Sequence, residues 1–170
     1  MAVGGGGGAG SGRPVVPVTV DVDLAPFKHL IATFENLGPL TKTPIERSLL
    51  VMMESIDENF QVGGRPRWVP SQRALATEGG RTLIDEGTLR ASIQIGSKDN
   101  VYNVEEWHGT LGTTVPYAVY HQEGTKRMVA RPFVVVQDED REDIQSTFAE
   151  YFAEHFATVG LQSQSRTKGA

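Results

Sequence analysis

The sequence predicts an α+β fold in which helices flank an antiparallel β-sheet. Three observations predict it. The valines of VVPVTVDVD, residues 15–23, alternate with the two-residue period of a strand. The segments 43–60 and 138–156 carry apolar residues three and four positions apart, the spacing of a helix with one buried face. Between them, two strand-like runs separated by Gly96–Asn100 are typical of a hairpin.

The composition is that of one globular domain without disulfide bonds. The chain has 170 residues, enough for a sizeable core. It has no cysteine, which excludes disulfides, thiolate catalysis and cysteine-ligated metal centres. With 16 basic and 21 acidic residues the net charge is −5, unlike a protein that coats duplex DNA. No apolar run approaches the roughly 20 residues of a membrane span, and no export signal is recognisable.

Both ends differ in composition from the middle of the chain. We expect a flexible glycine-rich leader at residues 1–14, one domain at 15–157 and a flexible tail at 158–170. The five glycines of the leader could suggest a phosphate-binding loop. That motif requires a Lys-Ser/Thr pair after the last glycine and a helix behind it. Arg13 and Pro14 follow instead, which favours a flexible leader.

The first strand should lie at an edge of the sheet, or Pro17 should mark the start of the strand. Proline cannot donate a hydrogen bond to a neighbouring strand, and Pro17 stands at the start of the alternation formed by Val16, Val18, Val20 and Val22. A helix is expected over 23–38, with apolar residues at helical spacing and Gly38 as its stop.

The segment 43–60 predicts the clearest helix. Thr43 is the expected N-cap, Pro44 the first helical residue and Glu46 the partner in a capping box. Its apolar stripe should fill the core and consists of Ile45, Leu49, Met52, Met53, Ile56 and Phe60.

The following loop places three arginines around Trp68. Arg65, Arg67 and Arg73 with this indole could stack on nucleic acid, or they could form a solvated rim around a half-buried tryptophan. A short helix is expected within 71–80, followed by a turn at Gly87.

The second half of the domain is expected to supply further strands and a last helix. A strand should begin at about Arg90, and Gly109 and Gly112 indicate a bulge or a close backbone approach. Residues 131–137 resemble a short strand. The helix from residue 138 has acidic residues in its first turn and should bury Ile144, Phe148, Tyr151, Phe152, His155 and Phe156.

Chemistry-bearing residues are densest at 115–133, VPYAVYHQEGTKRMVARPF. These side chains could form a catalytic pocket or a glycine-hinged docking loop. The histidines, His29, His108, His121 and His155, form no close metal-ligand pair, and no nucleophile elbow is present. We therefore expect no enzyme activity, no cofactor and no metal. A small hydrolase with His121 as general base is the alternative, and it would need a ligand pocket beside that residue.

Gly124 is expected to free the backbone for a basic, apolar arm, residues 125–133. Phe133 is the expected anchor of the arm and Arg131 its register-setting donor, docked either on this domain or on a neighbour. His121 and Gln122 can hydrogen-bond loop carbonyls beneath the arm.

Four motifs in order resemble one family. They are RWVPSQ, LIDEGTLRASI, VPYAVYHQEGT and RPFVVVQDEDREDI. Together they are similar to the phage virion morphogenesis family, the tail completion proteins of Mu-like tailed phages. Glu123 and Val134-Val135 depart from the family pattern. The signature residues, which are the interface candidates, are Trp68, Tyr117, His121, Gln122, Gly124, Arg131, Pro132 and Phe133.

The resemblance implies a structural virion protein at the neck or tail, made in the host cytoplasm. Its implied fold is tail-terminator-like. Its implied role is tail completion and head–tail joining, as a ring, usually a hexamer, that caps the tail tube. The implied partners are further copies of itself, the tail tube protein and the head–tail connector; DNA only passes through the lumen and no membrane is involved. A nucleic-acid-binding module and a small hydrolase remain the alternatives.

Overall fold

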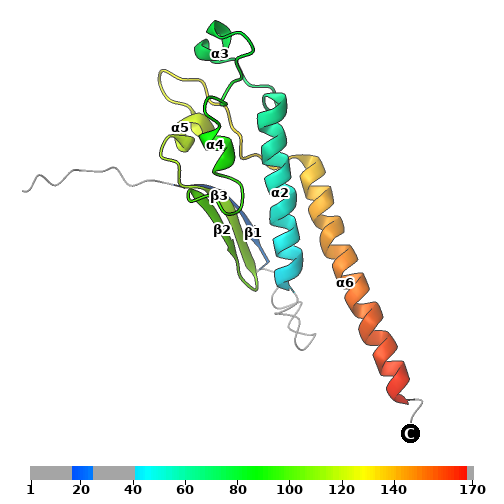
Figure 1. Ribbon diagram of the computed structural model, residues 1–170. Coiled ribbons are helices and arrows are strands. Elements are labelled where there is room, and N and C mark those ends of the chain that lie inside the picture. Colours follow the sequence, from blue (N-terminus) through cyan, green and yellow to red (C-terminus); the bar gives the residue numbers. More distant parts are fainter. Residues whose placement is uncertain (1–16, 25–40, 168–170) are drawn as a thin grey trace, which may run out of the picture.

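The computed structural model describes residues 17–24 and 41–167, with side chains described through residue 155 (Figure 1). The glycine-rich leader and nearly all of the helix expected at 23–38 lie outside the described residues. The described elements, in chain order, are β1 (Val18–Asp23), α2 (Lys42–Val62), α3 (Gln72–Ala76), α4 (Thr88–Ala91), β2 (Asn100–Val104), β3 (His108–Thr113), α5 (Ala118–Glu123) and α6 (Asp138–Thr167).

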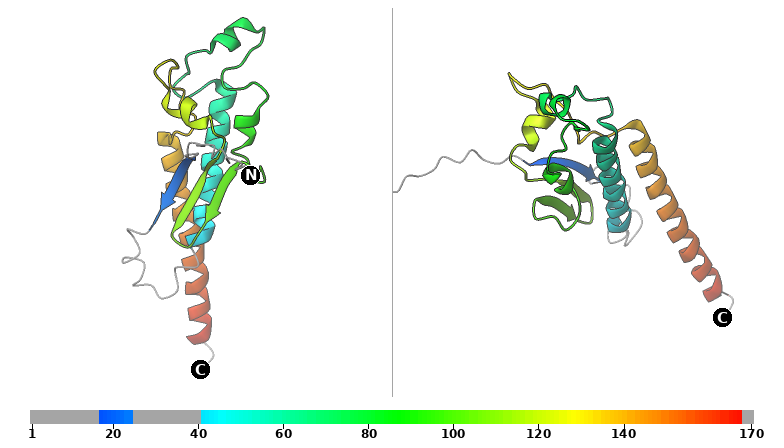
Figure 2. Two further views of the ribbon diagram at one scale, coloured as in Figure 1. Left: turned by 90° about the vertical axis from the view of Figure 1, so that its left-hand side faces the viewer. Right: turned by 45° about the horizontal axis from the view of Figure 1, so that its top comes forward.

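The described strands form a three-stranded antiparallel sheet in the order β1-β3-β2. Leu111 of the central strand pairs with Val20 on one side and Tyr102 on the other. The α+β class is thereby confirmed, as is the edge position of β1 that Pro17 indicated. The helix α2 contacts all three strands, and α6 packs on α2 (Figures 1 and 2).

The expected stripe of α2 forms the centre of the core. Five of its six apolar residues are buried and Met53 is partly buried. The prediction that Thr43 is the N-cap was wrong, however. The helix begins at Lys42 after Thr41, so Thr43 lies within the first turn. Pro44 is tolerated there because the amides of the first turn have no intrahelical partner. Gly63 ends the helix at φ 84°, a left-handed conformation that favours glycine.

The predicted strand at Arg90 and the hairpin turn at Gly96–Asn100 were both wrong. Residues 88–91 form α4, and the side chain of Asn100 donates to the Ile93 carbonyl at 2.8 Å. The hairpin consists of β2 and β3 instead. Its turn is closed by the Glu105 amide, which donates to the His108 carbonyl at 2.7 Å.

Both glycines of β3 mark a close approach, as predicted. A Cβ at Gly109 would lie 2.5 Å from Cγ2 of Ile45 on α2. One at Gly112 would lie 2.2 Å from the carbonyl oxygen of Val18 on β1. These contacts set how closely the helix and the edge strand pack on β3.

Residues 131–137 do not form the predicted strand. Their chain is extended, but the Phe133 and Val134 amides donate to the side chain of Gln122 instead of to another strand. The last helix, α6, was predicted, and it continues to Thr167, beyond the expected domain boundary at 157. Asp140 in its first turn is buried and accepts a 2.8 Å hydrogen bond from Ser55 of α2.

The predicted apolar face of α6 lies against α2, but it is only partly buried. Among its described members, Ile144 packs against the core, and Phe148, Tyr151, Phe152 and His155 keep part of their surface exposed. The guanidinium of Arg47 on α2 lies 5.6 Å from the ring of Tyr151. The side chain of Phe156 lies outside the described residues. The short helix expected within 71–80 is α3, whose cap is the Ser71 hydroxyl.

Candidate functional site

The dense stretch folds as a short helix followed by a returning arm. Helix α5 ends at Gly124, whose φ of 76° is left-handed. A Cβ at Gly124 would lie 2.7 Å from the Ala130 amide nitrogen, so the chain can fold back tightly only with glycine there. A bridge between Thr125 and Met128 closes the end of the arm. Lys126 and Arg127, the arm tip, are exposed there.

The base of the arm is anchored in the core of its own domain. Phe133 is fully buried, with its ring centroid 5.5 Å from that of Phe60 on α2. Trp68 packs edge-on against the same Phe60 ring at 5.7 Å. Its indole Nε1 donates to the Pro132 carbonyl at 2.8 Å, and Asn59 donates to the Phe133 carbonyl at 3.0 Å. The tryptophan motif and the Arg-Pro-Phe motif are thus one packed unit at the end of α2.

Gln122 holds the arm from beneath, as predicted. Its Oε1 accepts from the Phe133 and Val134 amides at 3.1 Å each, and its Nε2 donates to the Val134 carbonyl at 2.8 Å. His121 contributes through its backbone, because its carbonyl accepts from the Arg131 amide at 2.7 Å. Its imidazole does not bond the loop: Nδ1 is buried without a hydrogen-bond partner.

Arg131 sets the position of the arm against the tryptophan loop. It is only 7% exposed, and its Nε donates to the Val69 carbonyl at 2.7 Å. Its terminal nitrogens donate to the carbonyls of Val129 at 3.3 Å and Pro70 at 3.5 Å. Among the described residues, no carboxylate forms an ion pair with it. The guanidinium is therefore buried among neutral acceptors, with its charge uncompensated.

A pocket of about 480 Å³ lies beside His121 and Arg131. The Tyr117 ring stands edge-on to the imidazole at 5.8 Å, and Leu83 also lines the pocket. Burial, and secondly the charge of Arg131, lower the pKa of His121. Leu83 has a φ of 61°, a left-handed conformation that is strained for a residue with a side chain.

The chain is 32% identical to the Mu-like prophage FluMu G protein 2 of Haemophilus influenzae over 143 residues, which cover 78% of this chain and 96% of that protein. The chain belongs to this Mu-like prophage protein family. No protein-family model and no solved structure matches it. The Mu-like character that the sequence motifs indicated is thereby confirmed, and the tail-completion role stays a prediction.

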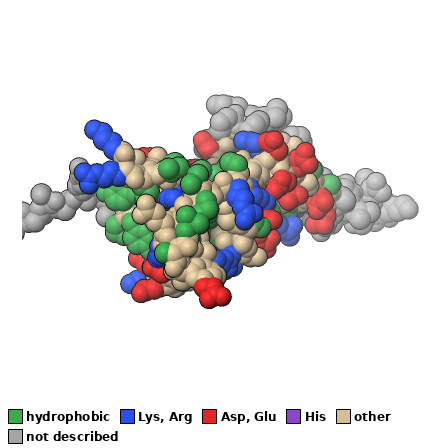
Figure 3. Space-filling model, turned by 90° about the horizontal axis from the view of Figure 1, so that it is seen from above, with side chains coloured by type: hydrophobic (Ala, Val, Ile, Leu, Met, Phe, Trp, Pro, Cys, Tyr) green, Lys and Arg blue, Asp and Glu red, His purple; other side chains and the backbone are tan. Residues whose placement is uncertain are grey.

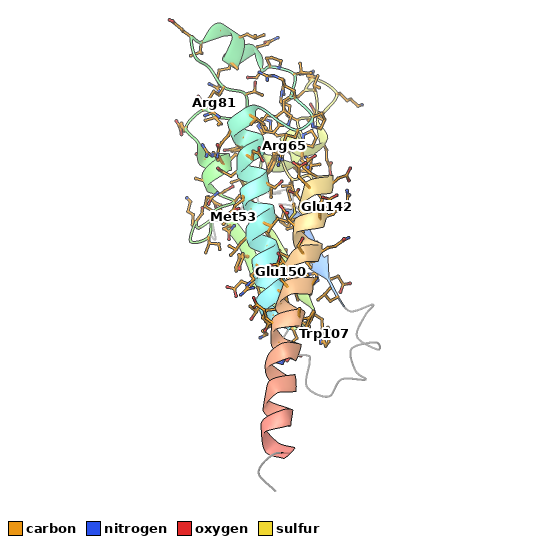
Figure 4. The ribbon with its side chains drawn as sticks, turned by 90° about the vertical axis from the view of Figure 1, so that its right-hand side faces the viewer. Met53, Arg65, Arg81, Trp107, Glu142 and Glu150 are labelled. Atoms are coloured by element: carbon orange, nitrogen blue, oxygen red, sulfur yellow. The ribbon has the colours of Figure 1, made fainter. Side chains whose placement is uncertain are left out.

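In this Mu-like protein two of the three arginines around Trp68, Arg65 and Arg73, bond to their own domain, while Arg67 is exposed. Arg65 pairs with Glu139 of α6 at 2.7 Å and donates to Asn59 and Ser55 of α2 (Figure 4). Arg73 donates to two carbonyls and pairs with Asp85 at 3.2 Å. Trp68 is 5% exposed, so its faces are covered by protein. The arrangement predicted for nucleic-acid stacking is not what the structure shows.

The pocket that a hydrolase would need is present beside His121, but no hydroxyl nucleophile among the described residues is hydrogen-bonded to this imidazole. Ser71 and Thr88 also line the pocket, yet Nδ1 of His121 bonds to neither hydroxyl. The Ser71 hydroxyl accepts the Ala74 amide and caps α3. In the ranges described, histidine and carboxylate side chains do not gather in threes or more as a metal site would require.

Of the signature residues, Trp68, Arg131 and Phe133 lie inside the domain, while Tyr117 is exposed at the pocket rim. Two features of the structure have no signal in the sequence. Leu83 shapes the pocket through an unusual backbone conformation, and Asp57 of α2 binds Arg90 of α4 through two hydrogen bonds of 2.6 and 2.7 Å. This Arg90 contact lowers the pKa of Asp57.

A bilayer-spanning helix does not occur in the part of the chain that the structure describes.

Proposed function

We propose that this protein is a structural component of a tailed phage that completes the tail and joins it to the head, as a ring capping the tail tube. One observation carries the proposal. Two of the four motifs that resemble tail completion proteins, RWVPSQ and RPFVVVQDEDREDI, meet in one packed unit, Trp68 with Pro132 and Phe133, in a chain of a Mu-like prophage family. That unit holds an exposed arm in place. A pre-organised arm loses little conformational entropy when it docks on a partner.

The surface around the arm supports docking. Val69 and Val129, whose carbonyls hold Arg131, are each 55% exposed, and Tyr117 and Tyr120 of the α5 segment are exposed as well. Exposed apolar side chains gathered around one element favour a protein interface. On this proposal the arm face contacts a further copy, the tail tube protein or the head–tail connector. A six-fold ring comes from the resemblance alone.

A hydrolase is the second candidate, because a pocket does lie beside His121. Catalysis would require the imidazole to reach a nucleophile or a water in that pocket. Nδ1 of His121 forms no hydrogen bond with a hydroxyl group, which favours the structural role.

The experiment is complementation of a phage from which the gene is deleted. The proposal predicts unjoined heads and tails in the lysate, and joined particles after purified protein is added. His121→Gln, which lacks a titratable ring, should complement as well as the natural protein. Normal virion yield without the gene would contradict the structural role. Failure of a folded His121→Gln variant would instead favour the hydrolase.

A further inference from the structure

Two flanks of the molecule carry opposite charges. Figure 1 shows α5 and the arm on one side of α2 and α6 on the other. Seen from above in Figure 3, lysine and arginine side chains project at the arm end, and a group of acidic side chains gathers at the α6 end. Helix α2 separates the two flanks, so one copy cannot bring them together.

The arm flank has cationic groups without counter-ions. The exposed side chains of Lys126 and Arg127 enter none of the ion pairs found among the described residues. Behind them, Arg131 lines the pocket and is satisfied only by carbonyls. A buried cation is stabilised most by an anionic acceptor, so this flank is suited to a carboxylate-bearing partner.

Two acidic residues that line the same pocket also contribute to the charge of the arm flank. Asp85 is already paired with Arg73 at 3.2 Å, and Glu86 is exposed at the rim. Glu123, the last residue of α5, is also exposed. Neither Glu86 nor Glu123 enters an ion pair among the described residues, so these two carboxylates offset only part of the charge of the arm tip and Arg131.

The α6 flank presents the complementary chemistry. Glu142, Asp143 and Glu150 are exposed and form no ion pair among the described residues (Figure 4). Asp143 and Glu150 are seven residues apart, about two helical turns, so they share one face of α6. Nearby acidic residues are already engaged, since Glu139 pairs with Arg65 and Asp138 with Arg141.

We infer that the arm flank of one copy binds the acidic face of α6 on the next copy, with carboxylates of that helix meeting Lys126, Arg127 and the pocket at Arg131. The inference rests on the proposed ring and names the surfaces that join its subunits. A contact between two different surfaces on opposite flanks repeats head to tail, and a rotation that closes this repeat produces a ring.

Charge reversal tests this pairing. The tip variant is Lys126→Glu/Arg127→Glu, and the helix variant is Asp143→Lys/Glu150→Lys, the two acidic residues that share one face of α6. Each places like charges across every interface, so ring formation on purified tail tubes should fall by at least about tenfold. All four sites are exposed. Melting temperatures close to that of the natural protein would show that the variants fold.

Recovery of ring formation, when the two sets of substitutions are combined, shows whether these two surfaces pair with each other. The chain carrying all four substitutions, and an equimolar mixture of the two variants, should each form rings again, because every interface then joins opposite charges. Lys98→Glu and Glu105→Lys/Glu106→Lys alter exposed charges on the β2 side of the sheet and should form rings normally.

The outcomes separate this inference from the proposed function. Rings formed equally well by the tip and helix variants would overturn the inferred interface and leave the ring intact. Loss of rings without restoration in the fourfold variant or the mixture would also overturn it. A natural protein that never forms rings on tail tubes would overturn the proposed function itself, and the inference with it.

Discussion

The indole Nε1 of Trp68 donates a 2.8 Å hydrogen bond to the carbonyl oxygen of Pro132, joining two motifs that are 64 residues apart. Trp68 and Phe133, the residue after Pro132, both pack against Phe60 at the end of α2. The contact fixes where the arm leaves the core, and therefore where its exposed tip is presented.

Replacing Trp68 with Phe should remove this hydrogen bond and leave the Pro132 carbonyl without its partner. We expect a loss of about 1–3 kcal/mol in the free energy of unfolding. Urea denaturation measures it. Trp107→Phe, at the partly exposed β2–β3 turn, is the matched control and should cost less. Equal effects at the two tryptophans would contradict the anchoring role of Trp68.

Gln122→Ala should destabilise the arm base, because it leaves the Phe133 amide and both polar groups of Val134 without their partner. The expected cost is about 1–3 kcal/mol. Hydrogen exchange of the Phe133 and Val134 amides should accelerate more than exchange in β3. Unchanged protection of these two amides would show that Gln122 does not hold the arm.

The pKa of His121 predicts a pH dependence of stability. Because burial and Arg131 lower this pKa in the folded state, the unfolded chain binds the proton more readily. Stability should therefore fall as the pH drops below about 6.5, the ordinary histidine pKa, and level off below the folded pKa. In His121→Gln the fall should be smaller. Parallel unfolding curves against pH for the two proteins, or a natural protein that gains stability on acidification, would refute this.

Gly109 should tolerate no side chain while Ile45 is present. Gly109→Ala places a methyl group against Ile45 Cγ2 and should cost about 1–3 kcal/mol. Ile45→Ala alone should cost about 2–5 kcal/mol. The double variant should cost less than the sum of the two, by about 0.5–3 kcal/mol, because the methyl group then fills vacated space. Strict additivity would mean that the two residues do not meet.

The elements with strong local patterns could be predicted from the sequence. Helix α2 buries the residues that its spacing indicated, because a single apolar stripe has one way to face a sheet. The segments at 90–95 and 131–137 were mispredicted for different reasons. The amides of residues 91–94 donate to carbonyls three or four positions back, so this segment forms α4 and the turns that follow it. The amides of Phe133 and Val134 donate to the side chain of Gln122, and no local period reports such a contact.

The candidate site shows the same limit. The sequence singled out Arg131 and Phe133 as docking residues, but it could not distinguish docking within the domain from docking on a neighbour. The structure places both within the domain. The pocket depends on how the loop carrying Leu83 folds against α5, and a leucine with positive φ leaves no trace in the sequence.

Electron microscopy of purified tail tubes mixed with the protein, combined with native mass spectrometry of the complex, tests the central claim most directly. The account predicts a closed ring at one end of each tube, with a bound mass that is an integer multiple of the chain mass. Tubes whose ends stay bare, or that carry only isolated monomers, would contradict it.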